Sequence, residues 1–312
     1  MHKAILQRLC SDPRQSLARF ATNREGMNIV GAFRDRVDHP LWIAKTATTP
    51  AAIAHLRQER DALVHLQPWS KALNIPAVLD AEETEEDLCL IQGAVDGVAP
   101  RMRLPVNLSS RRFPQPMLAA MSWLEHFRRW VTPPGGKSLM DITHEVIHGL
   151  EFLRPHSTST IDGLIKVLRN NPPSGRIPVV AVHGDFWWQN TLFGPHGIGV
   201  IDWDAFHAGV AIEDIFTFAL SCCIPNGRHL HDIDSFKSAF FASTSVCQFV
   251  QEAIADCHLG VGDARFCFYF FIANRTLFKA SSNDWLKVLG WLLEHDYPPV
   301  GRLAGFSDCH PT

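Results

Sequence analysis

The sequence predicts an α+β protein with two lobes, in which a small lobe with a sheet and one long helix precedes a larger, mainly helical lobe. Up to Gly93, short β-like runs dominate and a single helical stretch interrupts them. Beyond this point the apolar residues mostly recur with the 3.6-residue period of helices, apart from one β-like segment, Val179–Trp203. We therefore assign residues 1–93 to the first lobe and residues 94–312 to the second, with a linker near Gly93–Arg103.

The small lobe is expected to hold an antiparallel sheet. Its predicted strands are short apolar runs: Ile29–Arg34, Leu41–Thr46, Ala77–Leu79 and Leu88–Ile91. The first two runs are joined by Asp35–Pro40, whose residues favour turns, so they form a predicted hairpin. The last two flank the acidic run Glu82–Asp87, which we interpret as the solvated tip of a second hairpin.

One helix of the small lobe is predicted from Pro50 to about Leu66. Thr49 is a favourable N-cap residue, and proline suits the first helical position. One face of this helix is a stripe with the spacing 4, 3, 4, 3: Ala52, Leu56, Glu59, Leu63 and Leu66. Glu59 is the only charged member of the stripe, and a carboxylate on an apolar face is costly unless it is paired.

The larger lobe is expected to contain helices on both sides of the β-like segment. Helical periodicity predicts them at Gln115–Val131, Thr143–Leu153, Ile161–Leu168, Glu213–Cys223, Ser235–Ala255, Arg265–Ala280 and Asn283–His295. Within the β-like segment, the turn Gly194–Gly197 separates two apolar runs and predicts a hairpin.

The composition excludes several classes of protein. With 46% hydrophobic residues the chain is expected to be folded, and its formal charge of −3 encodes no bulk attraction to nucleic acid or to an acidic membrane. The longest apolar stretch, Phe266–Ala273, is far too short to cross a bilayer. The eight cysteines form no Cys-x-x-Cys pair and the start of the chain resembles no secretory signal, so we expect free thiols in a cytoplasmic protein. The oligomeric state stays open.

The most informative polar residues lie around the predicted hairpin. Asn190 comes just before its first strand and Asp202 just after its second, so antiparallel pairing brings both to the same end. Asp185 lies five residues before Asn190, within reach of the same point. Carboxylate and amide oxygens are the ligands that Mg²⁺ prefers, so the sequence predicts a magnesium site with a spare carboxylate beside it.

The pattern His183-x-Asp185-x-x-x-x-Asn190, followed by Asp202 after the hairpin, resembles the Brenner motif and metal-binding aspartate of the aminoglycoside phosphotransferase and choline kinase family. The resemblance implies a bilobal protein-kinase-like fold. It also implies that Asp185 is the catalytic aspartate, which orients the acceptor hydroxyl and takes its proton. Asn190 and Asp202 are then implied as the Mg²⁺ ligands.

Other residues near this motif are expected to support it. The segment Gly209–Asp214 resembles the Gly-x-Pro-x-x-Asp segment of the family, without its proline, and implies a structural role for Asp214. His183 is interpreted as a positioning residue. Trp187 and Trp188 either brace the loop by burying their rings or, in one case, offer an aromatic face to the acceptor.

Lys45 stands where the kinase-like fold keeps a strand lysine. It is the natural partner for Glu59, the one carboxylate of the apolar helix stripe. We predict an ion pair between them that holds the ammonium against the α- and β-phosphates of a nucleotide. The alternative is that Glu59 reaches solvent from the edge of the stripe.

Further nucleotide contacts are expected from backbone groups. Gly26 is the only glycine where protein kinases have a glycine-rich loop, and N–H groups from Gly26 to Asn28 are expected to contact the phosphates. The segment Leu88–Gly97 resembles the strand and linker of the family, which implies that the base binds between the lobes against Gln92 to Ala94. Both ATP and GTP remain candidate donors.

The expected function is transfer of the γ-phosphoryl group of a Mg²⁺-nucleotide to a hydroxyl of a small molecule. Candidate acceptors are an amino sugar or aminoglycoside, an amino alcohol, or a sugar intermediate. One alternative is a kinase-fold binding protein without catalysis, although every polar group that catalysis needs is present. The other is a metal-dependent hydrolase that uses His183, Asp185 and Asp202, which would leave Lys45 and Glu59 unexplained.

Overall fold

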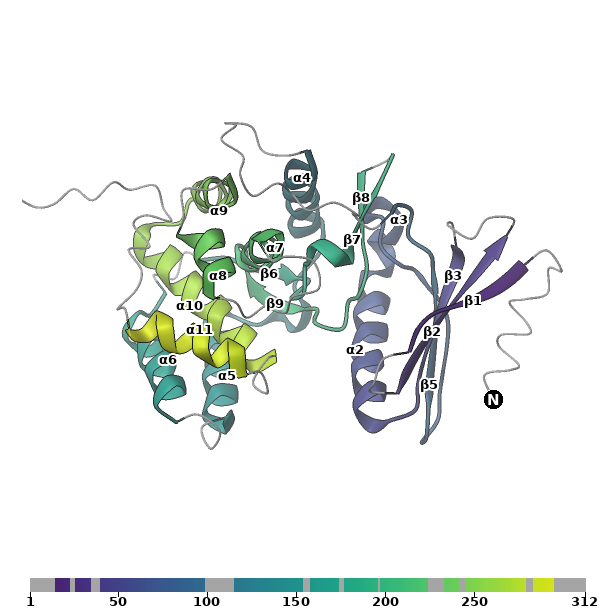
Figure 1. Cartoon of the computed structure of the whole chain (residues 1–312), viewed down its shortest axis with the longest axis horizontal. Helices are drawn as coiled ribbons and strands as arrows, with labels where there is room; N and C mark the ends of the chain where they lie inside the picture. The colour runs from purple at the N-terminus through teal and green to yellow at the C-terminus, as the bar shows by residue number, and fades with distance from the viewer. Residues whose placement is uncertain are drawn as a thin grey trace, which may run out of the picture. The chain divides into compact units, whose positions relative to one another are not determined.

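The computed structural model describes residues 15–22, 26–34, 40–98, 115–153, 158–173, 177–195, 197–223, 233–241, 245–278 and 283–294. The chain divides into two compact units (Figure 1). The first unit comprises Met1–Pro100 and Gln189–Phe206, and the second comprises Arg101–Trp188 and His207–Thr312. Within the described residues no helix is long and apolar enough to cross a membrane.

The first unit contains a five-stranded antiparallel sheet in the order β1-β2-β3-β5-β4. Its strands are β1 (Gln15–Thr22), β2 (Met27–Arg34), β3 (Pro40–Ala47), β4 (Val78–Glu83) and β5 (Leu88–Gly93). All four predicted strands are confirmed, whereas β1 was not predicted. The turn expected at residues 35–39 lies outside the described residues.

Helix α2 (Pro50–Leu66) packs against β3, β4 and β5 (Figure 1). Thr49 caps it as predicted, because its hydroxyl accepts a hydrogen bond from the backbone N–H of Ala52. The 4, 3, 4, 3 stripe is buried along its whole length. The helix therefore turns its apolar face, with Glu59 in it, toward the sheet.

The acidic run Glu82–Asp87 is only partly a hairpin tip. Strand β4 continues through Glu83, so the turn between β4 and β5 is limited to residues 84–87. Arg57 and Arg60 of α2 form ion pairs with Glu83, and these pairs hold the pKa of its exposed carboxyl below the usual range. The ion pairs with Arg57 and Arg60 of α2 explain why the acidic Glu83 is part of β4.

The predicted hairpin after Asn190 is confirmed and belongs to the first unit. It consists of β7 (Thr191–Gly194) and β8 (Gly197–Val200), which pair antiparallel. Gly197 has a φ of +113°, a conformation that favours glycine at the turn. The backbone of Gly199 runs so close to Val95 that a Cβ atom there would come within 2.2 Å of a Val95 methyl carbon. Close backbone packing therefore fixes the hairpin within this unit.

The second unit is mainly helical. Its helices are α4 (Gln115–Trp130), α5 (Leu139–Leu153), α6 (Thr158–Asn170), α7 (Glu213–Cys223), α8 (Ile233–Phe240), α9 (Ser245–Asp256), α10 (Val261–Phe278) and α11 (Asn283–Glu294). The prediction of one continuous helix over Ser235–Ala255 is wrong, because α8 ends at Phe240 and α9 begins at Ser245. Serine and threonine, which occupy positions 243 to 245, compete for backbone hydrogen bonds and favour helix ends.

A two-stranded antiparallel sheet lies among these helices. It pairs β6 (Val179–Val182), which was predicted, with β9 (His207–Val210), which was not. Beside it, α7, α8 and α10 share a buried cluster of phenylalanines with contacting ring centroids 4.8–6.2 Å apart: Phe216, Phe236, Phe240, Phe268 and Phe271. This aromatic packing forms a buried core shared by the three helices.

Candidate active site

The loop that follows β6 carries the predicted catalytic motif and is held by α7. The buried carboxylate of Asp214, in the first turn of α7, accepts hydrogen bonds from the backbone N–H groups of His183 and Gly184 at 2.9 and 3.0 Å. His183 is fully buried, and its Nδ1 accepts the backbone N–H of Asp185 at 3.2 Å. Asp214 thus holds the backbone of the loop, as expected, while the positioning role of His183 stays a prediction that its contact with the Asp185 backbone supports.

Burial raises the pKa of Asp214 to about 6, against the lowering effect of the hydrogen bond from His183. The folded protein therefore binds this proton more tightly than the unfolded chain, and the contribution of Asp214 to stability is lost as the pH rises from about 4 to about 6. We expect Asp214→Asn to remove this pH dependence. Urea unfolding of both proteins across this range should show their stability difference changing up to about pH 6 and constant above it. A difference that stays constant throughout would contradict the assignment.

The side chain of Asp185 is fixed by two donors of the second unit. Nη1 of Arg275, on α10, donates a hydrogen bond to Asp185 Oδ1 at 2.9 Å, and the indole N–H of Trp187 donates to the same oxygen. The Asp185 side chain keeps an exposed fraction of 30%, while that of Arg275 is only 4%. The carboxylate thus combines a fixed orientation with access to solvent.

The two tryptophans of the loop differ in their burial. Trp187 is buried, and its backbone N–H donates to the carbonyl of Asp185 at 2.7 Å. Trp188 is half-buried, with its ring centroid 5.8 Å from that of Phe218 on α7 and its backbone N–H bonded to Ser221 Oγ at 3.0 Å. Bracing by ring burial is therefore confirmed for Trp187, whose burial argues against its use as an acceptor platform, whereas the half-buried Trp188 contacts α7 and its ring stays a candidate acceptor platform.

In the first unit, Lys45 and Glu59 form the predicted ion pair. The Lys45 ammonium donates to both Glu59 oxygens at 2.7 Å, and the two side chains are exposed by only 8% and 2%. Burial alone would lower the pKa of Lys45, but the attraction of Glu59 and Asp202 raises it above its usual value. The lysine is therefore a fixed cation, and the alternative in which Glu59 reaches solvent is excluded.

Two further residues complete the surroundings of this pair. Lys45 also donates to Asp202 Oδ1 at 3.1 Å. The side chain of Gln92, on β5, hydrogen-bonds Glu59, and its Oε1 is buried with no hydrogen-bond partner among the described residues. The backbone contact of Gln92 with a nucleotide base stays a prediction, and the structure adds a role for its side chain in supporting Glu59. Its backbone lies within the sheet, opposite Ile43 and Val78.

Asn190 and Asp202 lie at the same end of the β7–β8 hairpin, as predicted. The carbonyl of Asn190 accepts the backbone N–H of Ile201 at 3.0 Å, which places Asn190 beside the residue before Asp202. Asp202 has a φ of +70° and a side chain that is 48% exposed. A carboxylate and an amide supply hard oxygen donors, so these residues fit Mg²⁺, which commonly takes few protein ligands together with phosphate oxygens and waters. The described part of the chain holds no group of three or more His, Cys, Asp or Glu suited to a metal.

This assignment predicts that Asp202→Asn weakens the Mg²⁺-dependent part of nucleotide binding while the protein stays folded. Asparagine tolerates the left-handed backbone conformation of this position and removes only the charge. Titration of nucleotide with and without Mg²⁺ measures the effect, and Asp61→Asn, an exposed carboxylate on α2, is the control. Equal Mg²⁺ dependence in the variant and the parent would contradict the role of Asp202.

The structure also describes the residues whose backbone groups are predicted to contact the nucleotide. Gly26 has a φ of +92° and lies against Thr48, whose hydroxyl donates to the Gly26 carbonyl at 3.3 Å. Asn28 is opposite Thr46 on β3, one residue from Lys45, so it lies at the same end of the sheet as the ion pair. The N–H of Ala94 donates to the carbonyl of Leu41 at 3.2 Å. The backbone group of Ala94 to consider for a contact with the nucleotide base is therefore its own carbonyl.

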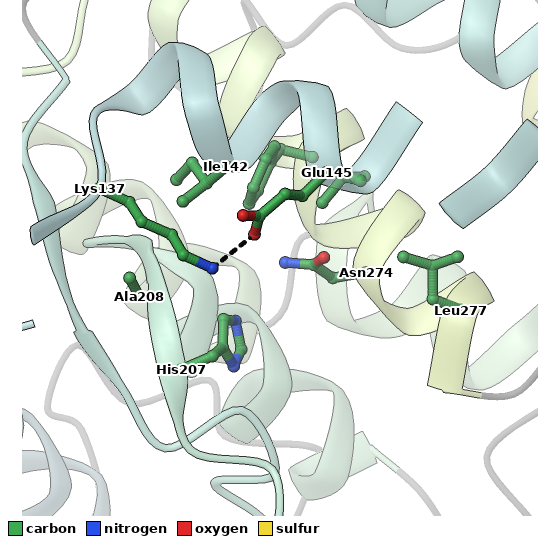
Figure 2. Close-up of a pocket in the computed structure, with 9 residues that line it drawn as sticks. Lys137, Ile142, Glu145, His207, Ala208, Asn274 and Leu277 are labelled. Carbon is green, nitrogen blue, oxygen red and sulfur yellow. Dashed lines mark hydrogen bonds and ion pairs between the residues drawn. The ribbon is translucent and has the colours of Figure 1, made fainter. Parts of the chain in front are cut away.

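A pocket of about 270 Å³ opens in the second unit between α5, β9 and α10 (Figure 2). Its walls are largely apolar, but Lys137 and Glu145 pair at 2.7 Å on one side, and His207 and Asn274 face the pocket from the other. Beneath them the buried Glu213 Oε1 accepts from Asn274 at 2.7 Å and lies 3.1 Å from His207 Nε2. A few polar groups in an apolar wall are typical of a small-molecule site.

Sequence reasoning missed Arg275, the indole donor of Trp187, and the side-chain role of Gln92. Arg275 carried a usable signal, because it is a charged residue next to the apolar stretch Phe266–Ala273 of a helix. A charge at a buried helix position demands a partner, which is the argument that identified Glu59. No sequence pattern places the Trp187 indole or the Gln92 amide.

Solved structures share the fold over most of the chain. An aminoglycoside phosphotransferase from Streptomyces rimosus, in complex with ADP and streptomycin, is 15% identical with a TM-score of 0.52, and the match covers 88% of this chain and 97% of that one. The ternary complex of APH(2'')-IIa with streptomycin and ATP is 13% identical, with a TM-score of 0.58 and coverage of 94% and 96%. Choline kinase from Cryptosporidium parvum is 10% identical, with a TM-score of 0.54 and coverage of 94% of both chains.

These similarities show that the chain has the protein-kinase-like fold. A search of the curated proteins found no significant match to the sequence. The model of the phosphotransferase enzyme family, which includes the aminoglycoside phosphotransferases, matches residues 32–235, more than half of the chain. This protein therefore belongs to the phosphotransferase enzyme family.

Proposed function

We propose that the protein transfers the γ-phosphoryl group of a Mg²⁺-nucleotide to a hydroxyl group of a small molecule. The observation that carries this proposal is the buried Lys45, whose ammonium is bonded to both oxygens of Glu59 and to Asp202. A lysine held in this way beside a half-exposed carboxylate is suited to phosphate oxygens and a metal ion. Family membership supports a phosphotransferase, and the nucleotide complexes of similar structures support a nucleotide donor.

In the proposed reaction, the acceptor oxygen forms a bond to the γ-phosphorus while the bond from that phosphorus to the bridging oxygen breaks, which releases the nucleoside diphosphate. Asp185 orients the acceptor hydroxyl and takes its proton. Lys45, held by Glu59, binds the α- and β-phosphates. Asn190 and Asp202 would hold Mg²⁺, which neutralises charge on the phosphates.

The acceptor is proposed to bind to the second unit, which carries Asp185. Helix α10 links Asp185 to the pocket of Figure 2, because Arg275 bonds Asp185 while the preceding residue, Asn274, lines the pocket. The apolar walls with His207, Asn274 and Glu145 favour a small amphipathic alcohol. Amino alcohols and amino sugars are therefore the first compounds to test, followed by neutral sugars.

The test has two parts. Melting temperature with Mg²⁺-ATP and with Mg²⁺-GTP identifies the donor, since a ligand of the folded state raises it. A screen of hydroxyl compounds with that donor, read by release of nucleoside diphosphate, then identifies the acceptor. Nucleotide binding without turnover on any compound would favour the silent kinase-fold binding protein. An absence of nucleotide binding would contradict the proposal.

A further inference from the structure

Helix α10 carries a buried cation at Arg275. The side chain is exposed by only 4%, and its Nη2 is buried with no hydrogen-bond partner among the described residues. A buried guanidinium is costly, and an unsatisfied donor adds to the cost. A helix selected for packing alone would carry an apolar residue at this position, so the local contacts of Arg275 have to explain its presence.

Those contacts all lead to the catalytic loop. Arg275 Nη1 donates to the carbonyl of Gly184 at 3.3 Å and to Asp185 Oδ1 at 2.9 Å. The guanidinium carbon also lies 5.0 Å from the centre of the Trp187 ring. A guanidinium attracted to an aromatic face has a restricted orientation. Arg275 is therefore anchored by Trp187 and, in turn, anchors Asp185.

Trp187, which lies in the same loop as Asp185, also binds Asp185. Its indole N–H donates to Asp185 Oδ1, the oxygen that Arg275 binds, and its backbone N–H donates to the Asp185 carbonyl at 2.7 Å. The two donors that bind Oδ1 restrict rotation of the carboxylate. The backbone carbonyls of Gly184 and Asp185 are also held by hydrogen bonds, so the backbone that carries the carboxylate is fixed as well. Oδ1 cannot then turn freely toward a substrate.

We infer that Arg275 and Trp187 are positioning residues for Asp185, which fix its Oδ1 and with it the orientation of the carboxylate toward the acceptor hydroxyl. This inference rests on the proposed function. Neither residue is assigned a contact with substrate, so each acts through Asp185. Misplacement of a reacting group by about 1 Å can cost about 10²-fold in rate, which sets the size of the expected effect.

The test compares Arg275→Met and Trp187→Phe with a matched control, Arg265→Met. Arg265 lies on the same helix and is also placed over an aromatic ring, 5.9 Å from the centre of Tyr269. We expect Arg275→Met to lower kcat by about 10²-fold and Trp187→Phe by less, because phenylalanine keeps a ring beside Arg275. Nucleotide affinity should stay unchanged in both, and Arg265→Met should retain the parental kcat.

Two further measurements separate positioning from a structural role. Added guanidinium ion should restore part of the activity of Arg275→Ala, whose short side chain leaves room for the ion, and should not change the activity of the control. In an Asp185→Asn background, Arg275→Met should cause no further loss, because the group that it positions has already been replaced. The inference would be overturned if Arg275→Met lowered kcat by the same factor in the parent and in the Asp185→Asn background. It would also be overturned if the kcat of Arg275→Met equalled that of Arg265→Met.

The outcomes also distinguish this inference from the proposed function. If the parent protein transfers phosphate to no acceptor, the proposed function fails and the positioning roles fall with it. If the parent is active and the variants retain its kcat, only the inference fails. If Arg275→Met does not fold, Trp187→Phe decides, and an unchanged kcat in that variant overturns the inference.

Discussion

Asp185→Asn is expected to lower kcat by about 10²–10⁴-fold, the range that general acid–base groups contribute, while nucleotide affinity stays close to that of the parent. Asparagine offers one oxygen, which can accept the bonds from Arg275 and Trp187 that Asp185 Oδ1 accepts. It then presents an amide N–H₂ group in place of the second oxygen. The loop should keep its shape, and only the ability to take a proton should be lost.

The measurement is steady-state turnover on the identified acceptor, together with nucleotide titration. Asp256→Asn is the control, since Asp256 is an exposed carboxylate at the end of α9 in the same unit. The control should leave both quantities unchanged. If Asp185→Asn kept the parental kcat, Asp185 would have no part in the reaction, even if phosphoryl transfer by the protein were established.

Lys45→Met is expected to lower both stability and nucleotide affinity. The substitution leaves Glu59 buried without its cation, a change that costs about 3 kcal/mol when one partner of a buried pair is removed. The nucleotide loses a charge-assisted hydrogen bond worth about 1.5–3 kcal/mol, so its affinity should fall by about tenfold or more. Urea unfolding and nucleotide titration measure the two effects, and Lys71→Met, an exposed lysine on α3 (Ser70–Leu73), is the control.

A double-mutant cycle with Glu59→Leu tests the pair itself. Glu59→Leu alone should cost less stability than Lys45→Met, because Lys45 keeps Asp202 at 3.1 Å as a partner. The double variant removes both buried charges and should recover much of the lost stability, while nucleotide binding stays weak. Coupling of less than about 0.5 kcal/mol would show that the two side chains do not interact in solution.

Most of the fold followed from local patterns in the sequence. The cap at Thr49 and the stripe along α2 identified both ends of that helix, and the turn at Gly194–Gly197 identified the β7–β8 hairpin. Strand β9 was missed because His207–Val210 contains a single β-branched residue and no clear alternation of apolar and polar side chains. It exists because β6 pairs with it, and pairing between distant segments leaves little local signal.

In the candidate site, too, local patterns identified some residues, whereas residues that depend on contacts between distant segments were missed. Glu59 was identified because a carboxylate interrupted an apolar stripe, and Asp185, Asn190 and Asp202 because their spacing matches a known motif. The charge of Arg275 beside an apolar stretch of α10 indicated a buried cation, but α10 is apolar around most of its circumference, so the sequence did not indicate which residue pairs with it. Its partner lies 90 residues away in the chain, and only the packing of α10 against the loop brings them together.

Phosphorus NMR of the reaction mixture tests the central claim most directly. With Mg²⁺-nucleotide and the acceptor found in the screen, the parent protein should convert the γ-phosphate signal into that of a phosphomonoester on the acceptor, in equal amount to the nucleoside diphosphate formed. Asp185→Asn should form this product slowly or not at all. If the γ-phosphate instead appears only as inorganic phosphate, or the nucleotide stays intact with every acceptor, the protein is not the phosphotransferase proposed here.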